Sequence, residues 1–265
     1  MTNLHVDHYE SARSGAPLLL IHGWGMHGGT WKSVAERLAQ HFNVYAVDLP
    51  GHGHSARERE SNRDFTLDAI VDQLAEQFTG PLTVCGWSLG GQVALRWALR
   101  HPQQVERLVM VASTPCFIRL DDWRYALSVG ILEEFAASLQ HHYALTLKRF
   151  LSLQLRGCEQ EREVLAILRD GLFSRGEPLL SALQSGLEIL RDSDQRGDLP
   201  EVRQPTLVLA GERDTLIPHQ AAQYLASQIR GARLAMIKGA AHAPFLSHPD
   251  EFIKHLMDFL EDSKV

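Results

Sequence analysis

Short apolar runs alternate with amphipathic segments along the first part of the chain, from residue 16 to residue 113. The apolar runs have the length of strands and lie between glycine, proline and polar residues, whereas the amphipathic segments have helical periodicity. Continuously apolar strands that alternate with helices are typical of a parallel sheet covered on both faces. The pattern predicts strands at 18–22, 43–48, 82–86 and 107–112, with helices at 34–39, 67–78 and 92–100.

The alternation stops just after residue 113 and resumes near residue 204. Between about 121 and 191 there is no strand-like run, and the sequence predicts helices with breaks near Gly130, Gly157, Gly171 and 176–178. Later strands are predicted at 206–210 and 233–237, with helices at 220–228 and 249–262. We therefore expect an α/β core formed by 1–113 and 192–265, with 114–191 inserted as a helical lid.

Composition narrows the class of protein. With 265 residues, 45% hydrophobic and 22% charged, the chain has the profile of a globular α/β protein. Its longest apolar run is too short to cross a bilayer and its start lacks the features of a signal peptide, so we expect a cytoplasmic protein that binds no membrane. We also expect a monomer. A net charge of −6 disfavours nucleic acid as a partner. Three cysteines without C-x-x-C spacing predict neither disulfides nor a metal site.

The sequence Gly-Trp-Ser-Leu-Gly at 86–90 is the most informative motif. It follows a predicted strand and precedes a predicted helix, which is the context of a nucleophile elbow. Such a turn presents the Ser88 hydroxyl to a base, and its glycines let strand and helix approach closely. The motif alone is short enough to be an ordinary turn, so the interpretation depends on finding partners for Ser88.

Asp214 and His242 are the predicted partners, because a serine hydroxyl needs a base and a group that orients that base. Each follows a predicted strand, and the carboxyl ends of parallel strands meet at one edge of a sheet. The order Ser, Asp, His along the chain is that of α/β hydrolases. The alternatives that we considered are Asp48 and Glu212 as the acid, and His22, His52, His54 and His248 as the base.

Acyl transfer also needs donors for the oxyanion. We expect one to be the backbone N–H of Leu89, directly after the serine, and the other that of Trp24, in the loop after the first predicted strand. His22 is predicted to brace this loop. The resulting hypothesis is ester hydrolysis through an acyl-enzyme, which needs no metal or organic cofactor.

These motifs resemble the α/β-hydrolase superfamily over almost the whole chain. Within it, the sequence is most similar to the pimeloyl-acyl-carrier-protein methyl ester esterases of biotin synthesis, on the segments 20–25, 86–91, 112–117, 149–154 and 240–245. The resemblance implies a carboxylesterase that cleaves the methyl ester of a pimeloyl chain held on acyl carrier protein. Its channel for the methylene chain is expected to include Trp24, Trp87 and Phe150.

An acidic carrier protein requires a cationic surface, and basic residues gather in the predicted lid. Between 148 and 175 there are six of them against four acids. The resemblance implies that Arg149 and Arg162 are docking residues, and Arg156 joins them because it follows Arg149 by seven residues. Another position at which the family has a basic residue, near Leu145, is not basic here.

Other functions fit parts of the pattern. A short-chain carboxylesterase with broad specificity, or a carbon–carbon bond hydrolase, uses the same fold and the same catalytic residues. Haloalkane dehalogenases and epoxide hydrolases place aspartate where this chain has Ser88, which disfavours them. A ligand receptor on a hydrolase fold is a further alternative, and turnover of a nitrophenyl ester separates it from an enzyme.

Overall fold

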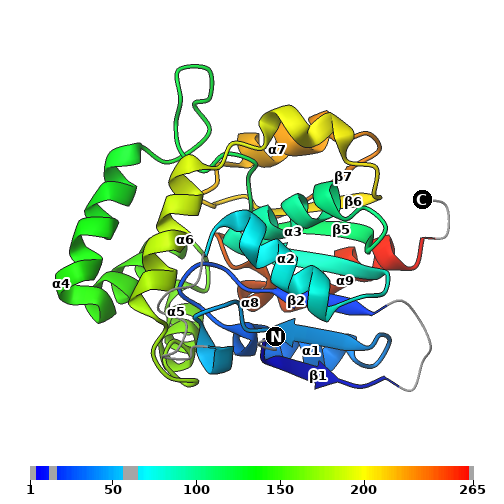
Figure 1. Ribbon diagram of the computed structural model, residues 1–265, viewed down its shortest axis with the longest axis horizontal. Helices are drawn as coiled ribbons and strands as arrows, with labels where there is room; N and C mark the ends of the chain where they lie inside the picture. Colours follow the sequence, from blue (N-terminus) through cyan, green and yellow to red (C-terminus); the bar gives the residue numbers. More distant parts are fainter. Residues whose placement is uncertain (1–3, 12–16, 56–64, 263–265) are drawn as a thin grey trace.

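The computed structural model describes residues 4–11, 17–55 and 65–262. Within them a seven-stranded sheet has the order β1-β3-β2-β4-β5-β6-β7, and every pairing except that of β1 with β3 is parallel. This arrangement confirms the predicted fold class (Figure 1). The strands are β1 (Val6–Tyr9), β2 (Leu18–Ile21), β3 (Val44–Val47), β4 (Leu82–Trp87), β5 (Val105–Val111), β6 (Thr206–Gly211) and β7 (Arg233–Ile237).

Strand β1 is the one strand of this sheet that the hydrophobic pattern did not predict. Its sequence, Val-Asp-His-Tyr, has no apolar run because β1 lies at the edge of the sheet and is only partly buried. The inner strands β2, β4 and β6 are buried at every position. The periodicity argument therefore finds the buried strands and the apolar edge strand β7, but it misses β1, whose sequence has no apolar run.

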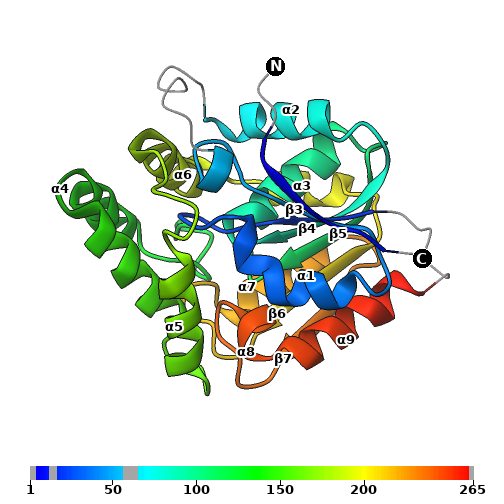
Figure 2. The ribbon, with the colours of Figure 1, turned by 90° about the horizontal axis from the view of Figure 1, so that it is seen from below.

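Helices cover both faces of the sheet (Figure 2). On one face lie α1 (Lys32–Leu38), α8 (Pro244–Ser247) and α9 (Pro249–Leu260). On the other face lie α2 (Leu67–Gln77), α3 (Leu89–Arg100) and α7 (His219–Gln228). Short 3-10 turns occur at η1 (Gly28–Trp31), η2 (Gly53–Ser55) and η4 (Arg196–Glu201).

Three helices lie between β5 and β6 in sequence and beside the sheet in space (Figure 1). They are α4 (Val129–Gln154), α5 (Glu161–Gly171) and α6 (Leu180–Asp192), and we call residues 114–191 the lid. Two details differ from the sequence analysis. Residues 121–128 form a folded loop rather than a helix, and α4 is kinked at His142, whose φ of −141° and ψ of 47° are not helical.

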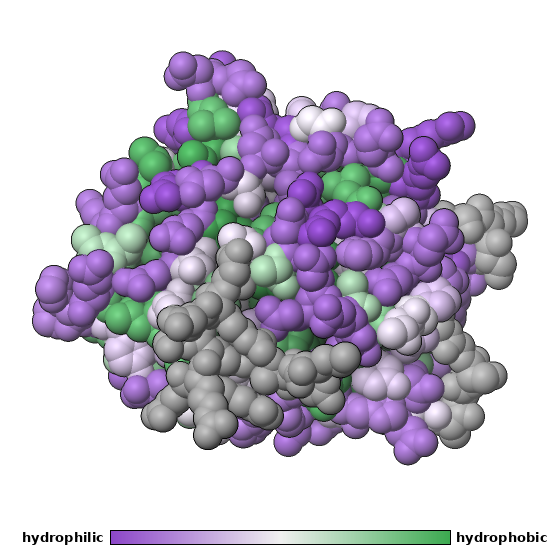
Figure 3. Space-filling model, viewed as in Figure 1, coloured by the Kyte–Doolittle hydropathy of each residue, from purple (hydrophilic) through white to green (hydrophobic). Residues whose placement is uncertain are grey.

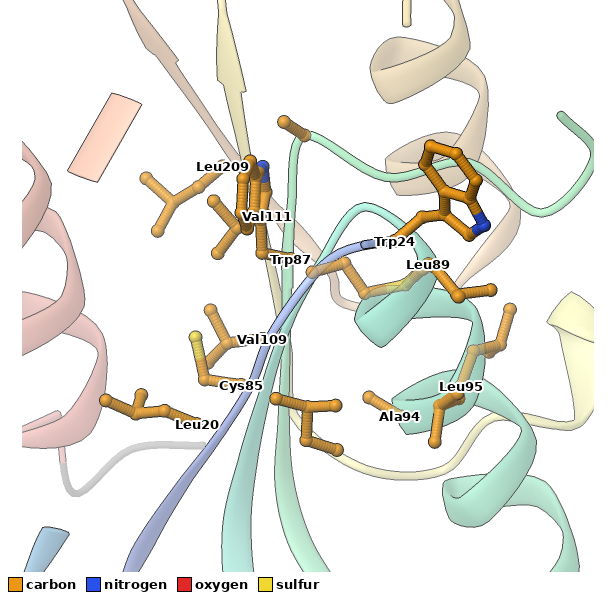
Figure 4. Packing of buried hydrophobic residues seen from close by; sticks show 14 of the residues in the cluster. Leu20, Trp24, Cys85, Trp87, Leu89, Ala94, Leu95, Val109, Val111 and Leu209 are labelled. Carbon is orange, nitrogen blue, oxygen red and sulfur yellow. The ribbon is translucent and has the colours of Figure 1, made fainter. Parts of the chain in front are cut away.

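The packed core extends from the sheet into the lid. The inner strands β2, β4 and β5 supply Leu20, Cys85 and Val109, which lie in one layer beneath the strand ends (Figure 4).

Among the helices of the described residues, none is both long enough and apolar enough to span a bilayer. The same residues contain no group of three or more His, Cys, Asp or Glu arranged to hold a metal ion.

Candidate active site

Ser88 lies in the turn between β4 and α3 with φ 56° and ψ −117°, a conformation that residues other than glycine rarely adopt. Four hydrogen bonds hold this turn, the longest of them from the Gln92 N–H to the Ser88 carbonyl at 3.4 Å. The Ser88 N–H donates to the carbonyl of Val111 at 2.9 Å, and the Ser88 carbonyl accepts from the N–H of Gly91 at 2.9 Å and from the Ser113 hydroxyl at 2.7 Å. The strained backbone is thus fixed by the neighbouring strand and by its own helix.

The glycines on either side of Ser88 are required by close backbone contacts. A Cβ atom on Gly86 would lie 2.1 Å from the carbonyl oxygen of Gly90, and one on Gly90 would lie 2.5 Å from that of Ile21. Any side chain at these positions would force the strand and helix apart. The Gly-x-Ser-x-Gly pattern therefore has a steric origin here.

Asp214 and His242 follow β6 and β7, and the structure brings them into contact. The Asp214 Oδ1 atom accepts hydrogen bonds from the N–H groups of Leu216 and Ile217, both at 2.9 Å. This leaves Oδ2 for His242, whose Nδ1 lies 2.8 Å away, with both side chains buried. A carboxylate accepts the Nδ1 proton, so Nε2 is the basic nitrogen of the neutral ring.

The loop that carries His242 is also held from β4 and from the lid. The Trp87 indole N–H donates to the His242 carbonyl at 2.7 Å, and the His242 N–H donates to the Gln154 carbonyl at 3.2 Å. His242 Nε2 is buried and has no hydrogen-bond partner within the described residues, and there is no hydrogen bond between it and the Ser88 hydroxyl. Such bonds often tighten only when substrate binds.

The loop after β2 packs directly on Ser88. A Cβ atom on Gly23 would lie 3.3 Å from the Ser88 Cβ atom. Within the described residues, the backbone N–H groups of Trp24 and Leu89 donate to no acceptor, so each is available to a ligand. Leu89 directly follows Ser88 and Trp24 directly follows Gly23, so both predicted oxyanion donors belong to segments next to the serine.

His22 fixes the orientation of this loop. Its Nδ1 lies 2.8 Å from the Gly23 carbonyl, and its Nε2 accepts from the Leu49 N–H at 2.9 Å. Burial holds the pKa of His22 well below its usual value, with His52 adding to the effect, so the ring stays neutral and can donate with one nitrogen while accepting with the other. Because the N–H of a trans peptide points opposite to its C=O, holding the Gly23 carbonyl aims the Trp24 N–H away from His22.

The family model described as alpha/beta hydrolase fold matches residues 16–249, a range that includes Ser88, Asp214 and His242. The chain belongs to the α/β-hydrolase family. Solved α/β-hydrolase-like structures superimpose closely. An esterase from Exiguobacterium antarcticum gives a TM-score of 0.86 at 22% identity, covering 97% of this chain and 95% of that one. A bromoperoxidase from Bacillus anthracis gives 0.87 at 22% identity, covering 98% and 95%. At these identities the likeness concerns the fold alone.

Curated relatives are more similar in sequence to this α/β hydrolase. The pimeloyl-[acyl-carrier protein] methyl ester esterase of Nitrosomonas europaea is 44% identical over 246 residues, which is 93% of this chain and 96% of the relative. The protein of the same name from Chromobacterium violaceum is 40% identical over 252 residues, covering 95% and 97%. The similarity therefore extends over core and lid together.

The aromatic residues predicted to contact the acyl chain lie in two places (Figure 4). Trp24 packs edge-on against Phe150 of the lid, with ring centroids 4.8 Å apart. Trp87 points the other way, is fully buried, and uses its indole N–H on the His242 loop. Trp24 and Phe150 remain predicted chain contacts, whereas the surroundings of Trp87 favour a role in positioning His242.

The predicted docking arginines are exposed. Arg149, Arg156 and Arg162 form no ion pair with any described residue. Helix α4 ends at Gln154, so Arg156 lies in the following turn and does not share a helix face with Arg149, contrary to what the spacing of seven indicated. Arg162 lies in α5, two turns before Arg169.

Arg175 is one of the six basic residues counted in the lid, but its surroundings differ from those of the exposed arginines. It reaches into the core and forms ion pairs with Asp7 and with the fully buried Asp48, the latter at 3.0 Å. Asp48 also accepts the N–H groups of Gly28 at 2.6 Å and His54 at 2.8 Å. Asp48 is therefore the anchor of a lid-to-core link. Because Arg175 and Asp48 are 127 residues apart, no local pattern revealed the pair.

Replacing Arg175 by alanine is expected to lower the free energy of unfolding by about 3 kcal/mol, because it leaves the buried Asp48 carboxylate without its cation. Urea denaturation measures this difference. Arg169→Ala is the matched control, since Arg169 is exposed and has only a 3.4 Å contact with the Ser152 hydroxyl; its effect should stay within about 0.5 kcal/mol. Equal effects of the two changes would show that the Asp48 pair contributes no special stability.

Proposed function

We propose that this protein is a serine carboxylesterase that hydrolyses the methyl ester of pimeloyl-acyl-carrier protein in biotin synthesis. The observation that carries the chemistry is the buried Asp214–His242 hydrogen bond, which leaves Nε2 unpartnered in the loop held against the Ser88 elbow. The relatives that are 38–44% identical and carry this enzyme name support the substrate.

The reaction starts when the Ser88 oxygen attacks the ester carbonyl and His242 Nε2 takes the hydroxyl proton. The N–H groups of Trp24 and Leu89 stabilise the oxyanion, each contributing about 3 kcal/mol. Collapse of the tetrahedral intermediate expels methanol, which takes the proton from His242. Water then attacks the acyl-enzyme with His242 as base, and the free carboxylate leaves Ser88 as it was. Asp214 stabilises the imidazolium in both halves.

Charge on the lid indicates where an acidic carrier would dock. A groove of about 470 Å³ between α4 and α6 is lined by Glu133, Glu188 and Arg191 together with apolar and glutamine side chains, and hydrophobic patches are visible on this side of the molecule (Figure 3). The exposed basic residues lie farther along, at the end of α4 and on α5. An acidic partner is therefore expected at Lys148, Arg149, Arg156, Arg162 and Arg169 rather than at the groove, where two carboxylates outnumber one guanidinium.

We further propose that the reaction takes place in the cytoplasm and that the enzyme acts as a monomer with one carrier per site. The pimeloyl chain would pass from the basic surface toward Ser88 along the apolar interior of the lid. Trp24 and Phe150 are the proposed chain contacts, because they pack against each other where lid helix α4 meets the loop beside Ser88.

Reversing two docking charges tests the choice of substrate. The Arg149→Glu, Arg162→Glu double variant is expected to lower kcat/KM for the carrier-bound methyl ester by about 10-fold or more, since both charges then repel the carrier. The value for free dimethyl pimelate should not change. Parallel steady-state assays on both esters measure the ratio.

The matched control is the Arg230→Glu, Lys254→Glu double variant. Both residues are exposed on the core; Arg230 precedes β7 at the amino ends of the strands, away from the site, and Lys254 lies on α9. The control should keep the carrier preference of the wild type. If the wild type cleaves both esters alike and neither variant changes the ratio, the protein is a carboxylesterase of broad specificity.

A further inference from the structure

The side chain of Trp24 is embedded in the lid, although its backbone belongs to the loop beside Ser88. The indole N–H donates to the Leu183 carbonyl of α6 at 2.9 Å, and the ring is 2% exposed. Phe150 of α4 packs against the same ring. One residue thus links two lid helices to the predicted oxyanion loop.

Gly186 makes this contact possible. A Cβ atom at this position would lie 2.6 Å from Trp24 Cδ1 and 3.0 Å from Nε1. Gly186 is in the interior of α6, where glycine is unfavourable for helix stability. The close approach of the indole therefore explains why this position is a glycine.

The next residue of the loop is held by the lid in the same way. Gly25 has φ +72°, and a Cβ atom there would lie 2.8 Å from Leu147 Cδ2 of α4 and 3.7 Å from Leu183 Cδ2 of α6. The loop therefore has His22 on its core side and two lid helices on its outer side. Neither end of the Gly23–Gly25 segment can shift without moving one of them.

We propose that Gly186 is a positioning residue for the oxyanion hole: by seating the Trp24 indole on α6, it fixes the peptide whose N–H serves as a donor. The inference rests on the proposed esterase mechanism, in which that N–H binds the oxyanion. It follows that the hole is complete only while α6 is seated on the loop. Displacing α6 would release the indole and disorder the donor, so hydrolysis is coupled to lid closure.

Gly186→Ala tests the coupling, with Gly130→Ala as control because a Cβ atom on Gly130, also in a lid helix, would meet no atom within 4 Å. With nitrophenyl butyrate, Gly186→Ala is expected to lower kcat about 100-fold while KM stays within about twofold. The affinity for butylboronic acid, whose adduct with Ser88 places an oxygen in the hole, should fall in parallel. Gly130→Ala should match the wild type.

A double variant shows whether the effect passes through Trp24. Trp24→Leu removes the ring that a Cβ atom at 186 would strike, so adding Gly186→Ala to it should change boronate affinity by less than about twofold. Hydrogen exchange of the peptide spanning 23–25 should rise in Gly186→Ala and not in the control. Thermal unfolding confirms that each variant is folded.

The coupling is overturned if folded Gly186→Ala keeps wild-type kcat and boronate affinity, or if it lowers them equally with and without the Trp24 indole. If the esterase proposal itself is wrong, the result is different, because the wild type then releases no nitrophenol. The exchange measurement does not depend on turnover and tests the mechanical link in either case.

Discussion

Replacing Ser88 by alanine is expected to lower kcat for ester hydrolysis by about 10⁶-fold, because the change removes the atom that forms the acyl-enzyme. Binding of the ester should persist, since the hole and the lid contacts are untouched. Steady-state assays give kcat, and mass spectrometry of the intact protein after mixing with a nitrophenyl ester shows whether an acyl group is attached.

Ser227→Ala provides the matched control for this prediction. Ser227 is exposed on α7, and its hydroxyl bonds only locally, to the Tyr224 carbonyl and the Gln228 amide. It should retain full activity. Retention of more than about 1% of wild-type kcat by a folded Ser88→Ala variant would contradict nucleophilic catalysis at this position.

Asp214→Asn is expected to lower kcat by about 10⁴-fold through the tautomer of His242. The Leu216 and Ile217 N–H groups require an oxygen at the Oδ1 position, so the amide nitrogen of the asparagine would face His242 Nδ1. An N–H donor there forces Nδ1 to accept and puts the ring proton on Nε2. The base that Ser88 needs is then absent, although no atom has moved.

The neighbouring Glu212 offers a matched change from carboxylate to amide. Its side chain accepts one hydrogen bond, from the Gly239 N–H at 3.2 Å, and does not contact His242. Glu212→Gln should stay within about threefold of wild-type kcat. If Glu212→Gln lowered kcat as much as Asp214→Asn, the assignment of Asp214 as the orienting acid would be wrong. Near-wild-type activity of Asp214→Asn would show that Asp214 takes no part in the mechanism.

The catalytic candidates could be predicted because each comes directly after an apolar strand. Such runs predict strands of a parallel sheet, and the direction of the strands then places Ser88, Asp214 and His242 at one edge. The contact between Asp214 and His242 follows from this topology. Their exact separation does not, since it depends on backbone donors in the loop after β6.

Long-range contacts outside the strand pattern could not be predicted. The sequence places Arg175 among the basic lid residues, because no residue near it in the sequence indicates that it pairs with Asp48 in the core. The sequence predicts Trp87 as a wall of the acyl channel, because no local pattern indicates that its indole N–H donates to the His242 carbonyl. The kink at His142 could not be predicted either, because there is no glycine or proline at that point of the helix.

Contacts between the lid and the core give the proposed function a structural basis for control. The Arg175–Asp48 pair and the hydrogen bond from the Trp24 indole to Leu183 both attach the lid to the core. His27 adds a third link, with Nε2 2.7 Å from the Gly171 carbonyl. We therefore expect the lid to exclude water from the ester and to aid its orientation.

The most direct test of the account is the position of cleavage in pimeloyl-acyl-carrier protein methyl ester, which has a methyl ester at one end and a thioester to the carrier at the other. Mass spectrometry of the carrier after incubation with the wild type distinguishes the two. We predict that the chain loses the mass of one methylene and stays on the carrier, in a reaction that Ser88→Ala does not perform. Release of the whole acyl chain from the carrier, or an unchanged substrate under conditions where nitrophenyl esters are cleaved, would contradict the proposed function.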